Sequence, residues 1–316
     1  MARVLITTDY ASPEADGVLT GAGHTIHRRP LRGLTADEIV AALDGVTGAI
    51  IANDPLTAAV LDRCDSLRAV VRSGVGYDSV DVEAATRRGI SVSNLPGVNS
   101  NAVAEYTMGL LLATARNLVT SARGVGEGGW PRTGGRELRG ATVGLVGFGA
   151  AARAIVPLVL AFGMRVLCVT SVPTTRPGVE FVDLPTLLRR ADFVSLHTAL
   201  TASTRHLIDK AALAAMKPTA VLVNTARGPL VDEAALADAV RHGRLAGAAL
   251  DVVDTEPLPA DSPLRGVEGI TVYPHMAGQT VEARRTTAVE AARELVAALA
   301  GRPRTSLNHH LTKAVR

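Results

Sequence analysis

Three residues that can take part in acid–base or anion chemistry follow separate apolar runs in the second half of the chain: Arg227, Glu256 and His275. The carboxyl ends of parallel strands meet at one edge of a sheet, where ligands bind, so we expect these side chains to lie close together. A histidine whose protonated form is stabilised by a carboxylate can exchange a proton near neutral pH. An arginine offers a fixed fork to a carboxylate or a developing oxyanion. The three residues therefore predict proton transfer at an anionic substrate.

A glycine-rich turn, Gly147-Phe-Gly149-Ala-Ala-Ala152, follows an apolar run and opens a segment with helical spacing. Gly147 permits a tight turn, Gly149 lets the backbone approach a pyrophosphate, and Ala152 is small enough for helix–strand packing. The start of the helix presents free N–H groups and a partial positive charge to the anion. The turn predicts dinucleotide binding, although a tight strand–helix turn in another α/β fold has the same sequence pattern.

The strand after this turn, Val166–Thr170, lacks the acidic residue that would hold the ribose 2′-hydroxyl of NAD. Thr170 and Ser171 offer hydroxyl groups to a 2′-phosphate, and Arg176 offers a charge. Without an acid the main repulsion against NADP is missing, although Thr170 could also bond the 2′-hydroxyl of NAD. The sequence favours NADP over NAD by a small margin.

Short apolar runs alternate with segments of helical spacing through the first hundred residues. The pattern predicts strands at Val4–Thr7, Gly48–Ala52, Leu67–Arg72 and Ile90–Ser93, and helices at Thr35–Leu43, Thr57–Cys64 and Val80–Arg88. Such alternation is typical of a parallel sheet covered on both faces by helices.

A second alternating series begins at Thr142, after a segment that is apolar on nearly every side, Asn101–Arg116. We expect that segment to be a helix buried in a core or an interface, and Gly124–Gly129 to be a linker. Further strands are expected at Arg165–Thr170, Phe193–His197, Ala220–Asn224, Ala246–Asp251 and Ile270–Tyr273. The last segment, Val281–Ala300, is expected to be a helix that returns to the first domain. The predicted domains are residues 1–99 plus 282–316, and residues 100–281.

Four segments, in chain order, resemble the motifs of the D-isomer-specific 2-hydroxyacid dehydrogenases, which include phosphoglycerate dehydrogenase and hydroxypyruvate/glyoxylate reductase. They are Asp192-Phe-Val-Ser-Leu-His197 before Leu200-Thr201, Asn224-Thr-Ala-Arg-Gly228, Asp251-Val-Val-Asp-Thr-Glu-Pro257 and Pro274-His-Met-Ala-Gly278. The resemblance implies an α/β protein with a Rossmann dinucleotide-binding domain inserted into a flavodoxin-like substrate domain. It also implies hydride transfer between NAD(P)H and a small 2-keto acid or D-2-hydroxy acid.

Arg227, Glu256 and His275 match the catalytic residues of this family. A lone arginine or histidine is more often structural than catalytic, but three such residues in the family's order are expected to be catalytic. His275 would then be the general acid in reduction and the general base in oxidation, with Glu256 stabilising its imidazolium.

The resemblance also implies which residues contact the cofactor. Asp251 matches the usual contact to the nicotinamide carboxamide, with the capping of a loop as the alternative. His197 and Thr198 match residues that line the cofactor, with a buried, hydrogen-bonded histidine as the alternative. The full expected set is Gly147, Phe148, Gly149, Ala150, Ala151, Thr170, Ser171, Arg176, His197, Thr198, Ala226, Asp251 and Gly278.

The segment Arg72-Ser-Gly-Val-Gly-Tyr-Asp78 resembles the family's substrate loop. Backbone N–H groups around Ser73, Gly74 and Val75 would form a nest for the substrate carboxylate, and Arg227 would supply a side-chain partner. Arg72 itself is expected to be solvated, as arginines at strand ends commonly are.

Four features depart from the family's pattern. Ala150-Ala151 replaces the Arg-Ile of the phosphate turn, Ala199 replaces a proline, and Thr170 replaces the acid. Ala52 lies about where phosphoglycerate dehydrogenases carry an arginine for the phosphate. We therefore expect a smaller acid than 3-phosphoglycerate, such as glyoxylate or hydroxypyruvate.

Other functions on this scaffold stay open. Glu256 argues against the formate dehydrogenases, which resemble one another in pairing the histidine with glutamine. A nucleotide-sensing interaction protein, similar to transcriptional corepressors, would keep the same residues, as would a specialised reductase acting on an unusual acid such as a phosphonate. Turnover of a 2-keto acid would distinguish an enzyme from a nucleotide-sensing interaction protein.

The composition limits the remaining possibilities. Lys and Arg number 33 against 30 Asp and Glu and are scattered, so no nucleic-acid partner is expected. No apolar run reaches the about 18 residues that span a bilayer, no signal peptide is evident, and the two cysteines are expected to be buried thiols. We expect a cytoplasmic homodimer without a metal site, the helix from Asn101 resembling the family's dimerisation arm. The basic tail Arg302–Arg316, with His309 and His310, is expected to be solvated.

Overall fold

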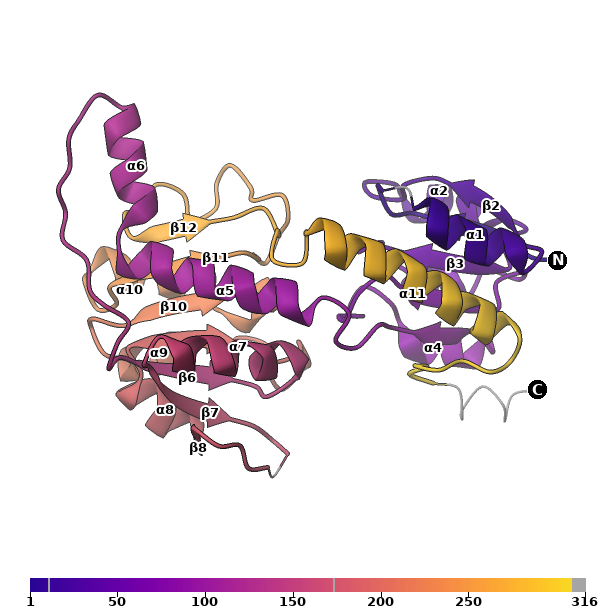
Figure 1. Ribbon diagram of the computed structural model, residues 1–316. Helices are drawn as coiled ribbons and strands as arrows, with labels where there is room; N and C mark the ends of the chain where they lie inside the picture. Colours follow the sequence, from indigo (N-terminus) through magenta and orange to yellow (C-terminus); the bar gives the residue numbers. More distant parts are fainter. Residues whose placement is uncertain (11, 173, 309–316) are drawn as a thin grey trace. The chain divides into compact units, whose positions relative to one another are not determined.

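The structure is a computed structural model that describes residues 1–10, 12–172 and 174–308. The chain divides into two compact units (Figure 1). Unit 1 comprises Met1–Asn99 and Thr280–Arg316, and unit 2 comprises Ser100–Gln279. The second unit is therefore an insertion into the first.

Unit 1 contains a five-stranded parallel sheet in the order β2-β1-β3-β4-β5. Its strands are β1 (Arg3–Ile6), β2 (Thr25–Arg28), β3 (Gly48–Ile51), β4 (Ala69–Arg72) and β5 (Ser91–Ser93). One face is covered by α2 (Ala36–Leu43), α3 (Ala58–Leu61) and α4 (Val82–Arg87), and the other by α1 (Pro13–Gly21) and α11 (Val281–Leu299). This strand order confirms the predicted flavodoxin-like fold.

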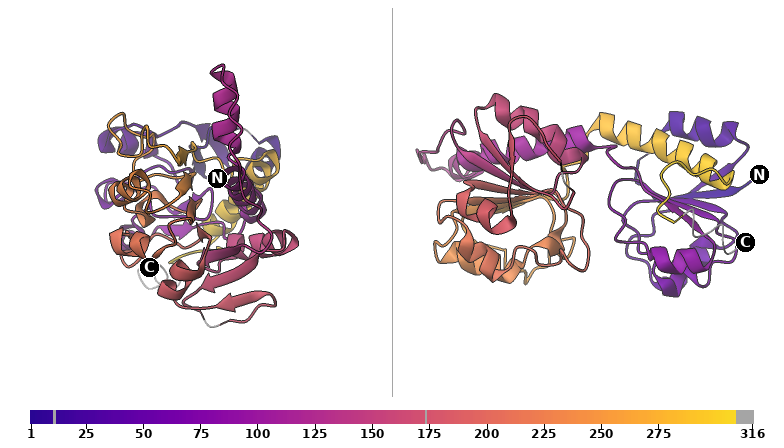
Figure 2. Two further views of the ribbon diagram at one scale, coloured as in Figure 1. Left: turned by 90° about the vertical axis from the view of Figure 1, so that its left-hand side faces the viewer. Right: turned by 90° about the horizontal axis from the view of Figure 1, so that it is seen from below.

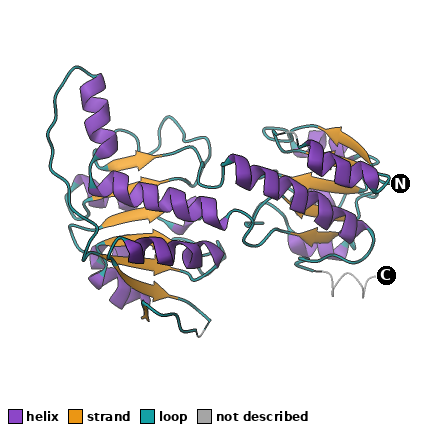
Figure 3. Cartoon of the chain, in the orientation of Figure 1, coloured by secondary structure: helices purple, strands orange, loops and turns teal. Residues whose placement is uncertain are grey.

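Unit 2 contains a seven-stranded parallel sheet in the order β12-β11-β10-β9-β6-β7-β8. Its strands are β6 (Thr142–Val146), β7 (Arg165–Val169), β8 (Val179–Phe181), β9 (Phe193–Leu196), β10 (Val221–Asn224), β11 (Gly247–Leu250) and β12 (Ile270–Val272). Helices α5 (Ser100–Ala115) and α7 (Ala150–Ala161) pack on one face, and α8 (Leu184–Arg190), α9 (Lys210–Ala215) and α10 (Glu233–Arg241) on the other (Figures 2 and 3). The order confirms the predicted Rossmann topology.

The apolar core explains why these strands are predictable from the sequence. Every residue of β6, β9, β10 and β11 is buried, as a parallel strand covered on both faces requires. In the edge strand β2, three of the four residues are exposed, and Ile26 is the single apolar residue. Among the elements absent from the prediction, α1, β2 and β8 are short or half-exposed and lack an apolar run.

The predicted linker at Gly124–Gly129 is wrong. Helix α6 (Leu118–Gly126) runs through its first glycines, and the whole stretch belongs to unit 2. The chain passes between the units at Asn99 and at Gln279 instead, and α5 begins directly at the first of these points.

Helix α5 was expected to be buried in a core or an interface, and one of its faces is buried in the core of unit 2. Ala104, Met108 and Leu111 pack into the core of unit 2, whereas Asn101 and Glu105 are exposed. Helix α6 has no buried residue at all and, with the loop that follows it, extends away from the sheet (Figure 1). Its exposed apolar side chains, and those of the loop after it, are Leu118, Val119, Val125 and Trp130.

The last helix returns to unit 1 as predicted, and the segment after it is held in place. Leu295 of α11 fills the space beside Gly48 on β3, where a Cβ would lie 3.1 Å from its methyl group. The buried carboxylate of Glu294 accepts the N–H groups of Arg304 and Thr305. Asn308 is fully buried and bonds β5. The prediction of a solvated tail is therefore wrong for Thr305 and Asn308, whereas Arg302 and Arg304 are exposed as predicted. The remaining positions, 309–316, lie outside the described residues.

Both cysteines, Cys64 and Cys168, are buried free thiols, which confirms the prediction. Within the described residues, no helix combines the length and apolar character needed to cross a membrane.

Candidate active site

The glycine-rich turn between β6 and α7 leaves open space for an anion. Gly147 has a φ of 100°, and a Cβ there would lie 2.6 Å from the carbonyl oxygen of His197, so only glycine fits. A Cβ on Gly149 would meet no atom within 4 Å, and Gly149 and Ala150 are exposed. The first N–H groups of α7, including that of Ala151, have no partner within the helix and are available to a pyrophosphate.

The aromatic residue of this turn faces the core. Phe148 is 8% exposed, and its ring packs edge-on against Phe181 with the centroids 5.1 Å apart. Its side chain is therefore not available to a cofactor, and any contact from this expected cofactor residue would come from its backbone.

The turn lies at the point where the strand order of unit 2 reverses, between β6 and β9. The N–H of His197 donates to Val146 at 2.8 Å, which places His197 and the half-buried Thr198 directly beside Gly147. The imidazole Nε2 lies 2.9 Å from the Ser195 hydroxyl, and burial lowers the pKa of His197 to about 4. The ring is thus neutral at pH 7 and hydrogen-bonded, and the expected place of His197 beside the cofactor stays a prediction.

The expected ribose end of the site lies at the end of β7. The N–H of Gly147 donates to Val169 at 2.9 Å, so Thr170 begins next to the glycine-rich turn. Its hydroxyl accepts the N–H of Val172 at 3.2 Å and is half-buried. Ser171 and Arg176 are exposed on the loop toward β8. The glycine-rich turn, the start of α7 and the hydroxyl groups that follow β7 together fit a dinucleotide.

His275 and Glu256 form a direct pair in unit 2. The Nδ1 atom of His275 lies 2.9 Å from a carboxylate oxygen of Glu256, and both side chains are about one-third exposed, at 32% and 30%. Burial raises the pKa of Glu256, but the hydrogen bond from His275 and its charge outweigh burial, so the pKa lies below its ordinary value. The N–H of Val253 and the charge of Arg227 act in the same direction. Glu256 is therefore an anion at neutral pH, facing the imidazole.

Arg227 is held by the loop that follows β10. The side chain of Asn224, fully buried, donates to the Arg227 carbonyl at 2.8 Å and accepts the N–H of the half-buried Ala226 at 3.0 Å. The Arg227 guanidinium donates to the Ala226 carbonyl at 2.8 Å. The loop thus fixes the backbone from which the guanidinium extends toward the charge of Glu256.

Two residues that the sequence did not single out position these loops. A Cβ on Gly228 would overlap the backbone of Val253, so this glycine lets the Arg227 loop contact the Glu256 loop. Glu233, at the start of α10, accepts the N–H of Asp254 at 2.7 Å. In the sequence, Glu233 resembles any acidic residue at the start of a helix, so no signal marks its role. Gly228 could have been found, because it directly follows Arg227.

Asp251 lies beneath the loop that carries His275. It is 1% exposed, and its carboxylate accepts the N–H groups of Met276 and Ala277. Because Tyr106 also bonds this carboxylate, one further lone pair is left for an additional donor, and the expected contact with a carboxamide stays a prediction. Gly278, expected to contact the cofactor, is half-buried and follows these two residues directly.

The expected substrate loop of unit 1 is only partly available to a carboxylate. The N–H groups of Ser73 and Gly74 already donate to the carbonyls of Ile51 and Arg72, both at 2.8 Å. The nest predicted from the sequence is therefore reduced to the amides from Val75 onward, and Val75 is exposed. Arg72 was expected to be solvated, but its guanidinium bonds Asn53 and the Ser73 carbonyl and so braces the loop.

Tyr10, which belongs to no motif of the sequence, reaches the same loop. Its hydroxyl lies 3.0 Å from that of Ser73, and the guanidinium of Arg284 lies 5.6 Å from the centre of its ring. Burial raises the pKa of Tyr10, so the phenol stays protonated at neutral pH. It can donate or accept a hydrogen bond at the edge of the substrate loop.

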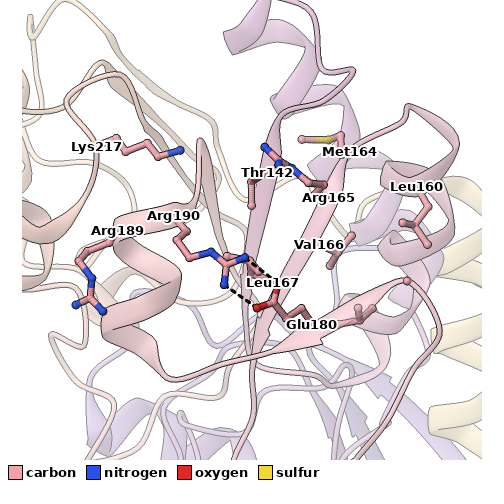
Figure 4. A pocket seen from close by; sticks show the side chains of 12 residues that line it. Thr142, Leu160, Met164, Arg165, Val166, Leu167, Glu180, Arg189, Arg190 and Lys217 are labelled. Carbon is pink, nitrogen blue, oxygen red and sulfur yellow. Dashed lines mark hydrogen bonds and ion pairs between the residues drawn. The ribbon is translucent and has the colours of Figure 1, made fainter.

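One cavity of unit 2 is separate from the expected dinucleotide site. It measures about 740 Å³ and is lined by the first residues of β6 and β7, Thr142 and Arg165, at the opposite edge of the sheet from the glycine-rich turn (Figure 4). Two of its four basic side chains are paired with acids, since Arg190 lies 2.6 Å from Glu180 and Lys217 lies 2.8 Å from an aspartate. Among the described residues no cluster of three or more His, Cys, Asp or Glu could hold a metal ion.

Comparison with known proteins identifies the family. Residues 108–277 match the family model described as "D-isomer specific 2-hydroxyacid dehydrogenase, NAD binding domain". A glyoxylate reductase of Thermofilum pendens is 42% identical over 259 residues, which cover 78% of this chain and 76% of the relative. The chain belongs to the D-isomer specific 2-hydroxyacid dehydrogenase family. It is accordingly an NAD(P)-dependent oxidoreductase that acts between 2-hydroxy acids and 2-keto acids.

Solved structures agree with this family assignment. A protein of Thermus thermophilus superposes with a TM-score of 0.89 at 39% identity, covering 96% of this chain and 99% of that one. An NADPH-dependent glyoxylate/hydroxypyruvate reductase of Sinorhizobium meliloti, solved with NADP and malonate, gives a TM-score of 0.86 at 31% identity and covers 98% and 97%. The dehydrogenase fold thus extends over both units of the chain.

Proposed function

We propose that the chain reduces a small 2-keto acid with His275 as the general acid. The observation that carries this proposal is the 2.9 Å contact between His275 Nδ1 and the anionic Glu256. With Nδ1 donating to that carboxylate, Nε2 is left to deliver a proton to the substrate carbonyl oxygen. In oxidation the same nitrogen takes the proton from the hydroxyl group.

The other residues of the proposed site act by binding and charge stabilisation. A nicotinamide cofactor held at the glycine-rich turn would supply the hydride for the carbonyl carbon. Arg227 offers its fork to the substrate carboxylate and to the oxygen that gains negative charge. Glu256 stabilises the imidazolium before the proton leaves His275. For unit 1 taken by itself, we propose that the amides from Val75 onward bind a carboxylate.

We assign the substrate to the small, unphosphorylated keto acids, such as glyoxylate or hydroxypyruvate. Ala52 offers no cation at the end of β3, and the buried carboxylate of Asp54 lies there instead, accepting the Ala52 N–H at 3.0 Å and the Thr7 hydroxyl. A buried negative charge at this edge disfavours a second anionic group on the substrate. The glyoxylate reductase of Thermofilum pendens supports the same class.

The substrate assignment is tested by a panel of 2-keto acids. Glyoxylate, pyruvate, hydroxypyruvate and 3-phosphohydroxypyruvate are each incubated with the enzyme and NADPH or NADH, and the loss of nucleotide absorbance is followed. We expect the highest kcat/KM with glyoxylate or hydroxypyruvate and the lowest with the phosphorylated acid. A preference for the phosphorylated acid would refute the assignment, and binding of nucleotide without turnover of any acid would refute the enzyme function.

We propose NADP as the preferred cofactor, because Thr170 and the exposed Ser171 and Arg176 face the ribose end without an acid. Thr170→Asp would place a carboxylate there, and two like charges about 4 Å apart repel by about 1 to 4 kcal/mol between water and a protein surface. We expect KM for NADPH to rise at least several-fold and KM for NADH to change little.

The matched control is Thr170→Asn, which has nearly the same shape as the aspartate but no charge. It should leave the ratio of the two KM values close to that of the wild type. An equal loss for both nucleotides in Thr170→Asp would contradict the cofactor assignment.

We further propose that the enzyme is a cytoplasmic homodimer and that its functional domains are residues 1–99 plus 282–316 and residues 100–281. The exposed apolar residues of α6 and its loop, including the 80%-exposed Trp130, support an interface between two copies. Sedimentation equilibrium should give twice the monomer mass, and a monomer at micromolar concentration would contradict the dimer.

A further inference from the structure

Three consecutive backbone amides of the loop that carries His275 donate to a single residue, Asp251. Its carbonyl oxygen accepts the N–H of His275 at 2.9 Å. Its two carboxylate oxygens accept the N–H groups of Met276 at 2.7 Å and of Ala277 at 2.8 Å. We propose that Asp251 is a positioning residue, which fixes the backbone of His275 for proton transfer. This inference rests on the proposed role of His275.

The backbone of His275 explains why an anion is needed at this place. Its φ of 58° lies in the left-handed region, which a residue other than glycine adopts only when its surroundings impose it. A left-handed residue turns the amides that follow it toward one side, where they form a nest for an anion. The carboxylate of Asp251 occupies this nest, so the anion is supplied by the chain itself.

Without that carboxylate the loop would lose the contacts that hold its conformation. Ala277 is buried, and an amide left there without an acceptor is strongly disfavoured. The loop would then relax toward the ordinary right-handed region for His275. Because φ fixes the direction in which the side chain leaves the backbone, this change would move the imidazole away from Glu256 and break their 2.9 Å contact.

Asp251 is itself anchored from two directions. Its N–H donates to the carbonyl of Asn224 on β10 at 2.8 Å, which fixes it to the sheet. Tyr106 on α5 forms a side-chain hydrogen bond with it, and burial together with the charge of Asp251 raises the pKa of Tyr106 to about 12. Tyr106 packs edge-on against Tyr273, with the ring centroids 6.0 Å apart. The anion is therefore held rigidly against the sheet and α5.

The substitution Asp251→Asn tests the proposal, because asparagine keeps the shape but can offer an acceptor to only one of the two amides. Hydrogen exchange of the peptide spanning residues 271–279 is measured by mass spectrometry, together with kcat for glyoxylate and the Kd of NADPH. We expect faster exchange of this peptide, a kcat lowered roughly 100-fold by misplacement of the imidazole, and a Kd changed by less than about two-fold.

The control is Asp254→Asn, the same substitution on the neighbouring loop, where the carboxylate is exposed and lies 3.7 Å from Arg205. It should leave both the exchange of residues 271–279 and kcat unchanged. Unchanged exchange in Asp251→Asn, with a raised Kd for NADPH, would overturn the proposal and leave Asp251 as a cofactor contact only.

A second variant guards against loss of folding in Asp251→Asn. Tyr106→Phe removes the phenolic hydrogen bond but keeps the carboxylate, and it should give a smaller increase in exchange and a smaller loss of kcat. If neither variant changes the exchange of residues 271–279, the positioning role is wrong. If the wild type itself turns over no keto acid, the proposed function fails, whereas the exchange experiment still decides whether Asp251 holds the loop.

Discussion

Replacing His275 by alanine is expected to lower kcat by about 10²- to 10⁴-fold, the usual contribution of a general acid or base, and to leave the Kd of NADPH nearly unchanged. The variant loses the group that delivers the proton to the carbonyl oxygen but keeps the glycine-rich turn at the end of β6. Stopped-flow absorbance measures kcat, and isothermal titration calorimetry measures the Kd of NADPH.

Two further variants separate chemistry from folding at this position. His275→Asn suits the left-handed backbone better than alanine and keeps a hydrogen-bond donor toward Glu256, but it carries no proton to transfer at neutral pH. It should be as inactive as His275→Ala and should unfold at the temperature of the wild type. His242→Ala, at the exposed end of α10 where the histidine pairs with Asp238, should keep full activity. A fully active His275→Ala enzyme would refute the role assigned to His275.

Arg227→Lys is expected to lower kcat/KM for glyoxylate by about 10²- to 10³-fold. Lysine keeps the positive charge but lacks the planar fork that binds two oxygens at once. The loss of one well-placed donor to a developing oxyanion accounts for a decrease of this size. Steady-state kinetics with glyoxylate varied at saturating NADPH measure the effect.

The matched control for this substitution is Arg241→Lys on α10, where the guanidinium is exposed and donates to the carbonyl of Pro263 at 2.7 Å. It should change kcat/KM by less than about two-fold, as surface substitutions do. Activity of Arg227→Lys close to that of the wild type would show that the fork of Arg227 does not bind the substrate.

The central strands of unit 2 can be predicted from the sequence because two-sided burial imposes a continuous apolar run. Thr142–Val146 is buried at each position and is evident as such a run. Edge strands carry no such pattern: Thr25–Arg28 has three exposed residues out of four. Helix α1 buries only Ala15 and Leu19 and has a glycine within it, which weakens its helical pattern.

The passage between the units could not be predicted from composition. Glycines favour loops because each disfavours a helix by about 1 kcal/mol, yet α6 continues through Gly124 to Gly126. The real passage at Asn99 leads directly into α5, and no change of composition marks it. Tertiary contacts, rather than local conformational preference, decide where α6 ends and where the chain passes between the units.

The pairing of Glu256 with His275 could be predicted, but the backbone geometry of this pair could not. Strand ends bring Glu256 and His275 together, and their hydrogen bond follows from residue type and place. The left-handed conformation of His275 depends on the carboxylate of Asp251, a partner more than twenty residues away in the sequence. The nest at Ser73 and Gly74 was expected to be free because the sequence does not show which carbonyls its amides already bond.

Reduction of hydroxypyruvate by the purified protein tests the proposed reaction most directly. The enzyme, NADPH and hydroxypyruvate are incubated together, nucleotide oxidation is followed by absorbance, and the glycerate formed is analysed on a chiral column. Hydride transfer coupled to protonation by His275 predicts that one D-glycerate forms for each NADPH oxidised. With His275→Ala, D-glycerate should form about 10²- to 10⁴-fold more slowly. Formation of L-glycerate, or nucleotide that binds without being oxidised, would contradict it.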